Sequence, residues 1–193
     1  AGRTPAPDLA RLFDDDASTR DAYLTRPGSA RAFGRGLVGR RVVSIDRRGK
    51  WLRFVLGDGG RLFAHLGMTG DWVRVARGAP PERFERARID VGARSVRYVD
   101  ARRFGRLLAA RSDIDAWNAL GPDPLGGLDV GALEAAFAKS KRAVKEVLMD
   151  QSVLAGVGNI IATEALWAAR VDPRAPARTL SRSEIRAVAR GVR

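Results

Sequence analysis

The sequence predicts an α+β protein in which an N-terminal antiparallel β-sandwich domain is followed by an all-α domain. Three observations support this prediction. Short runs with strand-like composition recur from residue 39 to residue 110. A proline- and glycine-rich segment, GPDPLGG, occupies residues 121–127, and beyond it the apolar residues recur with a helical period. A glycine turn at 156–158 then separates two helical patterns.

The strand-like runs are short and regularly spaced, and turn signals such as GDGG at 57–60 separate them. Short strands at regular intervals favour an antiparallel sandwich over a parallel sheet, whose strands alternate with helices. The expected strands are 41–46, 51–56, 61–65, 71–75, 87–91, 95–99 and 105–109.

The helical half opens after the linker, and residues 112–118 add a helical turn before it. The last expected helix begins with a capping box, Ser181 with Glu184 three residues later. Residues 1–30 are poorly patterned. The expected helices are 130–139, 141–150, 160–170 and 182–193, and the expected domains are 1–112 (sandwich), 113–128 (linker) and 129–193 (helical).

The glycine turn predicts an anion site. Gly156 and Gly158 form a bare-backbone turn, and Asn159 stands where the next helix begins. The first amide groups of a helix have no partner within it, and they favour an anion such as a phosphate. The expected helix 141–150 carries Lys141, Arg142 and Lys145 on its polar side. An αα-hairpin whose glycines only permit close packing is the alternative interpretation.

Composition favours a nucleic acid as the partner. The chain has 35 basic and 22 acidic residues, a net charge of +13 over 193 residues. Such a balance is typical of proteins that bind nucleic acid or an anionic membrane, and no apolar run approaches the ~20 residues of a membrane span. With no cysteine and a single histidine, we expect no metal site. We also expect no cofactor in this chain, no membrane association, a monomer and a cytoplasmic location.

Four blocks resemble the formamidopyrimidine-DNA glycosylase and endonuclease VIII family. They are RRGKWLRF (47–54), HLGMTGDW (65–72), DARRFGRL (100–107) and the pair LGPDPL (120–125) with KEVLMDQSVLAGVGNIIATEALWAARVDP (145–173). The resemblance covers roughly residues 33–193. It implies a base-excision repair DNA glycosylase and AP lyase that acts on oxidised bases in duplex DNA. It also implies that the helical domain is a helix–two-turn–helix.

The resemblance assigns roles to individual residues of the sandwich. Lys50 matches a lysine implicated in proton transfer near the lesion phosphate and sugar, and His65 matches a histidine that contacts phosphate. Met68, Arg102 and Phe104 match residues that enter the base stack when the damaged nucleotide is everted. From the residues alone, Lys50 reads as a surface lysine, and Met68 and Phe104 read as core residues.

In the helical domain, the resemblance makes Lys145 and Asn159 phosphate ligands, beside the turn of Gly156 and Gly158. The family also has features that this sequence lacks. Its nucleophile is the amine of an N-terminal proline followed by glutamate. This chain opens AGRTPAPDL, and only residues 5–8 bear a weak similarity to that motif. Its zinc-finger hairpin would require cysteines.

Three hypotheses therefore stand: a glycosylase seen without its nucleophile and zinc finger, a catalytically inactive homologue that binds damaged DNA, and an RNA-binding protein. The first two fit the blocks of the sandwich better than the third. We expect the chain as written not to form the covalent Schiff base.

Overall fold

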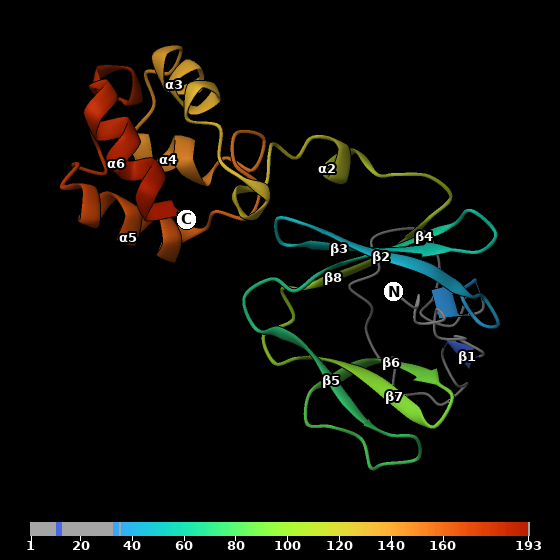
Figure 1. The fold of residues 1–193 in the computed structure, drawn as a ribbon. Helices are drawn as coiled ribbons and strands as arrows, with labels where there is room; N and C mark the ends of the chain where they lie inside the picture. The colour runs from blue at the N-terminus through green and yellow to red at the C-terminus, as the bar shows by residue number, and fades with distance from the viewer. Residues whose placement is uncertain (1–10, 13–32, 35, 193) are drawn as a thin grey trace, which may run out of the picture. The chain divides into compact units, whose positions relative to one another are not determined.

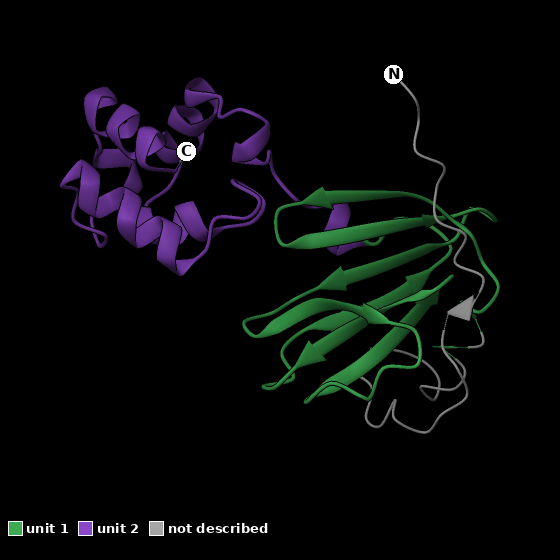
Figure 2. Ribbon diagram, turned by 60° about the horizontal axis from the view of Figure 1, so that its bottom comes forward, with its two compact units in different colours: residues 1–114 green, residues 115–193 purple. Residues whose placement is uncertain are grey.

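A computed structural model describes residues 11–12, 33–34 and 36–192 of the chain. The chain divides into two compact units, residues 1–114 and 115–193 (Figure 2). The segment 5–8, most of the poorly patterned stretch 1–30 and the final residue of the last expected helix lie outside the described residues.

The first unit consists of two four-stranded antiparallel sheets (Figure 1). The strand order is β1-β6-β7-β5 in one sheet and β2-β3-β4-β8 in the other. This architecture confirms the expected antiparallel β class of the first half. The strands are β1 (Arg11–Leu12), β2 (Val42–Arg48), β3 (Trp51–Leu56), β4 (Arg61–His65), β5 (Gly70–Ala76), β6 (Glu85–Val91), β7 (Arg94–Asp100) and β8 (Arg106–Ala110).

The core of this unit follows from the alternation of side chains along each strand. Leu62 and Ala64 of β4 belong to two clusters of apolar side chains, whereas the intervening Phe63 contacts Trp51 on the other face. One cluster is centred on Leu37, Val42, Leu56, Leu62 and Ile89, and the other on Ala64, Ala87, Tyr98 and Leu107.

Two loops pass from one sheet to the other at the same end of the strands. The β4–β5 loop leaves at His65 and re-enters at Gly70, and the β7–β8 loop leaves at Asp100 and re-enters at Arg106. His65 pairs with Arg106 in one sheet, and Gly70 pairs with Asp100 in the other. The register of both sheets therefore places these two loops side by side.

The second unit is helical, as expected, and its apolar side chains form one core that includes Leu133, Phe137, Leu148 and Leu166. Its last helix begins with the predicted capping box, because the Glu184 carboxylate accepts from the Ser181 amide at 2.8 Å. Its elements are α2 (Asp115–Asn118), η1 (Pro124–Gly126), α3 (Val130–Ala138), α4 (Val144–Met149), α5 (Asn159–Ala169), η2 (Ala177–Thr179) and α6 (Arg182–Val192).

One helix boundary differs from the sequence prediction by more than one residue. The expected helix 141–150 begins only at Val144, so Lys141 and Arg142 precede α4. The reason is tertiary: residues 140–143 pair with the segment 175–178, through the Ala177 amide to the Arg142 carbonyl (2.9 Å) and the Val144 amide to the Ala175 carbonyl (2.8 Å). Lys141 and Lys145 therefore do not lie one turn apart on a single helix.

None of the helices described is long and apolar enough to cross a bilayer. Within the same residues, histidine, aspartate and glutamate side chains form no group of three or more that could hold a metal ion.

Candidate nucleic-acid interface

A row of polar side chains crosses the end of the β2-β3-β4-β8 sheet beside the two loops. Trp51 pairs with His65, and His65 pairs with Arg106, so the three side chains share one face of the sheet. Lys50 occupies the β2–β3 turn immediately before Trp51 and is exposed. Lys50 and Arg106 both lie near enough to His65 for their charges to lower its pKa.

His65 is held as a neutral hydrogen-bond donor. Its Nδ1 accepts the Gly67 amide at 3.0 Å, which leaves the proton on Nε2. Burial lowers the pKa of the imidazole below its ordinary 6.5, and the charges of Lys50 and Arg106 lower it further. The Trp51 ring packs against it with centroids 4.9 Å apart. A neutral Nε2–H group beside two cations is suited to donate to a phosphate.

The two inter-sheet loops expose large side chains. Met68, on the β4–β5 loop, is 70% exposed, and Phe104, on the β7–β8 loop, is 50% exposed. The Arg102 guanidinium lies over the Phe104 ring, 4.8 Å from its centroid. Sequence composition alone favoured core positions for Met68 and Phe104, and the structure contradicts that alternative.

The backbones of the two loops are in direct contact. Gly67 has a φ of +62°, and a Cβ built there would lie 2.5 Å from the Phe104 carbonyl carbon. A Cβ on Gly105 would lie 1.5 Å from the Tyr98 hydroxyl oxygen. Only glycine permits this approach at both positions. The structure therefore brings together Met68, Arg102 and Phe104 on one surface.

Asp100 ties the two loops together. Its side chain is 1% exposed, and it accepts the Thr69 hydroxyl (2.5 Å) from one loop and the Arg103 (3.0 Å) and Gly105 (2.8 Å) amides from the other. Burial on its own raises the pKa of this carboxyl, but the hydrogen bonds to it outweigh burial, and the pKa lies below its ordinary value. Asp100 is therefore an ionised anchor.

In the helical unit, the glycine turn leads directly into α5. Gly156 has a φ of +95°, and Gly158 is the N-cap of α5 with no side-chain cap. The first hydrogen bond of the helix runs from the Ala162 amide to the Gly158 carbonyl, so the amides of the first turn, beginning at Asn159, have no acceptor within the helix. The Asn159 side chain is exposed at this end.

Gln151 braces the turn from inside. Its Oε1 accepts the Gly156 amide at 2.9 Å, and its Nε2 donates to the Met149 and Val157 carbonyls at 2.8 and 2.7 Å. One side chain thus fixes both sides of the turn that ends at the helix.

The cations of this unit differ in how far they are neutralised. Lys145 lies on α4, which packs against α5. Arg142 is paired with Asp150 at 2.8 Å and with Glu146 at 3.7 Å, so it contributes little net charge to an anion site.

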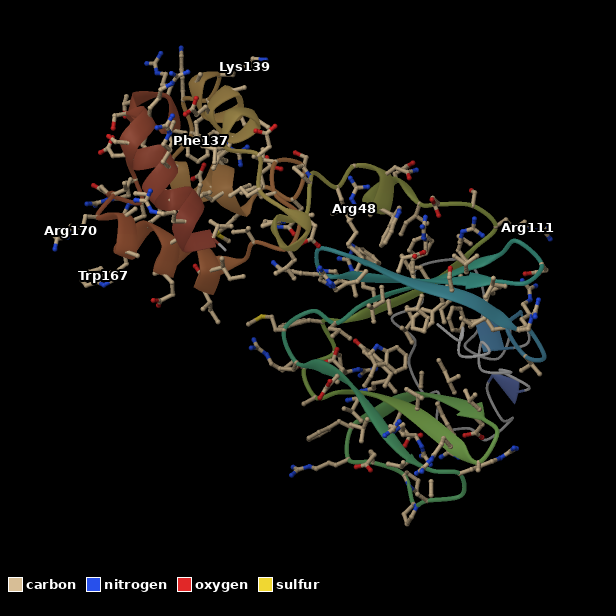
Figure 3. The ribbon with its side chains drawn as sticks, in the orientation of Figure 1. Arg48, Arg111, Phe137, Lys139, Trp167 and Arg170 are labelled. Atoms are coloured by element: carbon tan, nitrogen blue, oxygen red, sulfur yellow. The ribbon has the colours of Figure 1, made fainter. Side chains whose placement is uncertain are left out.

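At the other end of α5, Trp167 is 82% exposed, and it projects outward together with Arg170 (Figure 3).

Sequence reasoning missed three participants in these sites. Arg106 could have been found from strand pairing, because it stands opposite His65. Asp100 and Gln151 act through hydrogen bonds to loop amides, and no sequence pattern identifies such partners.

Comparisons with known proteins show the family of this chain. The N-terminal domain of formamidopyrimidine-DNA glycosylase matches residues 12–107, and the helix–two-turn–helix domain of the same enzyme matches residues 120–193. The chain belongs to the formamidopyrimidine-DNA glycosylase family. The match to the glycosylase begins further toward the N-terminus than the resemblance at 33–193 indicated.

Individual members of the glycosylase family are similar over most of this chain. The formamidopyrimidine-DNA glycosylase of Moorella thermoacetica is 43% identical over 159 residues, which are 79% of this chain and 58% of the relative. That of Pseudomonas paraeruginosa is 42% identical over 154 residues, 76% of this chain and 56% of the relative. The chain thus spans less than two thirds of the length of these curated relatives.

Solved structures of the glycosylase family share the fold. The crystal structure of the Thermus thermophilus protein has a TM-score of 0.77 at 35% identity, covering 97% of this chain and 66% of that one. The Lactococcus lactis protein, solved in complex with DNA containing FAPY-dG, has a TM-score of 0.82 at 26% identity, covering 97% and 70%. This match confirms the expected order of antiparallel sheets followed by a helix–two-turn–helix region.

Proposed function

We propose that this chain is the damage-recognising part of a base-excision repair DNA glycosylase and AP lyase that acts on oxidised bases in duplex DNA. The observation that supports the proposal best is the pair of fixed loops that expose Met68, Arg102 and Phe104. Exposed apolar side chains on rigid, glycine-packed loops have no role in the core, whereas a base stack that has lost a flipped nucleotide can accept them.

The roles follow from the geometry of each group. Met68 fills the void left by the flipped base, Phe104 wedges between neighbouring bases, and Arg102 donates to the partner base left unpaired. Neutral His65 donates Nε2–H to a phosphate, while Lys50 provides charge and a transferable proton beside it. Lys145 and the α5 N-terminus, with Gly156, Gly158 and Asn159, bind further phosphates.

The decisive measurement is the preference for damaged DNA. Arg102→Ala should reduce the ratio of affinities for abasic and undamaged duplexes, because contacts to bases are worth about 1–3 kcal/mol each. The charge-matched control is Arg94→Ala, an exposed arginine at the opposite end of the β5–β7 pair. The control should keep the ratio. An equal fall in both affinities for Arg102→Ala would contradict its assignment.

Covalent chemistry is tested separately. For the 193 residues as written, we propose selective binding without Schiff-base formation, because AGRTPAPDL lacks the Pro-Glu whose amine the family uses. Borohydride trapping on an abasic duplex should give no adduct. An adduct as abundant as that of a proline-terminated homologue would mean that another amine of this chain is the nucleophile. Selective binding without an adduct in any longer form of the protein would favour the inactive, damage-binding homologue.

A further inference from the structure

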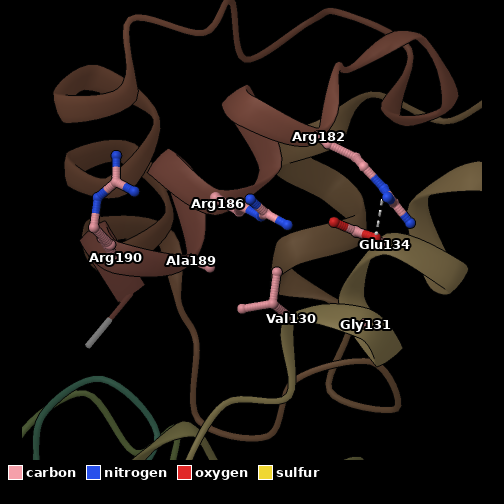
Figure 4. Close-up of a pocket in the computed structure, with 7 residues that line it drawn as sticks. All are labelled: Val130, Gly131, Glu134, Arg182, Arg186, Ala189 and Arg190. Carbon is pink, nitrogen blue, oxygen red and sulfur yellow. Dashed lines mark ion pairs between the residues drawn. The ribbon is translucent and has the colours of Figure 1, made fainter.

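A groove between α3 and α6 lies apart from every residue assigned above. It has a volume of about 410 Å³, and Figure 4 shows three arginines following one another along α6 on its wall. Val130 and Gly131, from the first turn of α3, and Ala189 line the apolar part. We propose that this groove is a second phosphate-binding site, which takes the sugar–phosphate backbone of DNA.

The charge of the groove is unbalanced. Arg182, Arg186 and Arg190 recur at intervals of four residues, so they lie on one side of α6. Among the described residues that line the groove, Glu134 is the only acidic one, and its carboxylate lies 3.3 Å from Arg182 Nε. Within residues 36–192, neither Arg186 nor Arg190 has an ion pair or a hydrogen bond through its side chain. Two arginines therefore remain available in a concave surface, where charges of one sign concentrate the field.

Helix energetics explain the position of only one of these three cations. A cation near a helix C-terminus is stabilising, which accounts for Arg190 in the last turn of α6. The same principle makes Arg182 in the first turn unfavourable and gives no reason for Arg186. The buried side of α6 is formed by Ile185, Val188, Ala189 and Val192, so the arginine row borders the core and is not needed to build it.

The spacing suits a chain of phosphates better than one small anion. Successive arginines are about 6 Å apart along the helix axis, so the row extends over roughly 12 Å. Along the duplex axis, each DNA strand advances about 3.4 Å per phosphate, so a row of this length parallel to the axis spans several phosphates. This inference rests on the proposed function for its choice of DNA over another polyanion.

The first test measures how salt weakens binding of the 193-residue chain to undamaged duplex DNA. Arg186→Gln with Arg190→Gln should lower the magnitude of the slope of log affinity against log salt by about 1.8, at about 0.9 per phosphate contact. Between 50 and 200 mM salt, wild-type affinity should therefore fall roughly twelvefold more than that of the variant. Both arginines are exposed, and an unchanged melting temperature checks folding.

The matched control removes the same two charges elsewhere. Arg77→Gln with Arg94→Gln alters two exposed arginines in adjoining turns, where the Arg77 amide donates to the Ala93 carbonyl. These turns lie at the end of β5 and β7 opposite Gly70 and Asp100. The control should keep the wild-type slope to within measurement error. Equal slopes for the two double variants would overturn the proposal that the groove binds phosphates, because the loss of net charge alone would then explain the change in slope.

The second test locates the ligand. In NMR spectra of the protein, the Nε–Hε signals of Arg186 and Arg190 should shift when duplex DNA is added. An oligoglutamate peptide at the same charge concentration should shift them less. Larger shifts with the peptide would overturn the assignment of DNA and indicate that the groove binds an acidic protein. Neither test uses a lesion, so a chain that showed no preference for damaged DNA would refute the proposed function without deciding the groove.

Discussion

His65 shows how one residue can make the stability of the sandwich depend on pH. Its folded-state pKa lies below the ordinary 6.5, because burial and two neighbouring cations disfavour the charged ring. As pH falls through 6.5, the unfolded chain takes up this proton before the folded chain does. The contribution of His65 is therefore fully present above pH 6.5, and it is lost as pH falls toward the folded pKa.

A comparison with His65→Gln isolates this contribution. Glutamine does not titrate, and its amide oxygen can still accept the Gly67 amide. Between about pH 7.5 and about pH 5, the melting temperature of wild type should fall further than that of the variant, because only wild type binds this proton. Carboxylates elsewhere in the chain change the melting temperatures of wild type and variant alike, so their effect cancels in the comparison. If pH shifted the melting temperatures of wild type and variant equally, the assignment of His65 as a neutral ring whose Nδ1 accepts the Gly67 amide would be wrong.

At the scale of elements, two inter-sheet loops act as one unit through Asp100. Asp100→Asn exchanges one acceptor oxygen for an NH₂ group that faces the donors of Thr69, Arg103 or Gly105. The loops should loosen, and the preference for abasic over undamaged duplex should fall several-fold, at about 1–3 kcal/mol for an unsatisfied buried group. Affinity for undamaged duplex should change little, because the contacts proposed between the helical unit and the DNA phosphates remain.

The control for this variant is another buried carboxylate. Asp90→Asn alters a side chain that is 6% exposed on β6 of the same unit but is bound to neither loop. It should preserve the lesion preference even if it lowers the melting temperature. Amide hydrogen exchange at 67, 103 and 105 should accelerate in Asp100→Asn alone. Equal losses of preference in the two variants would mean that Asp100 serves only general stability.

The elements also show which parts of the fold the sequence can predict. Strand alternation placed β3 and β4 at their observed ends, since each strand pattern depends only on neighbouring residues. The start of α4 was wrong because residues 140–143 pair with a segment more than thirty residues away. In the site, the family resemblance pointed to Lys50 and Met68, and the glycine turn pointed to the helix start at Asn159. Asp100, in contrast, acts on two loops that only the tertiary structure brings together. Local patterns do not record such long-range pairing.

At the scale of the whole molecule, the proposed contacts divide between two units with different tasks. In the proposed function, the sandwich would supply the contacts that distinguish damaged DNA, through Arg102 and its neighbours. The helical unit would supply phosphate contacts that carry no sequence or lesion information, through Lys145 and the start of α5. Because the two sets of residues belong to different compact units, we expect their contributions to binding to be independent.

A double-mutant cycle tests that independence. Lys145→Ala should weaken binding to abasic and undamaged duplexes by the same factor and leave their ratio unchanged, because a phosphate is present in both. Arg102→Ala should lower the ratio only. On abasic duplex, the double variant should lose the sum of the two single losses to within about 0.5 kcal/mol. A coupling energy well above that would show that phosphate binding in the helical unit helps to place Arg102 against the orphaned base, and the division of tasks between the units would fail.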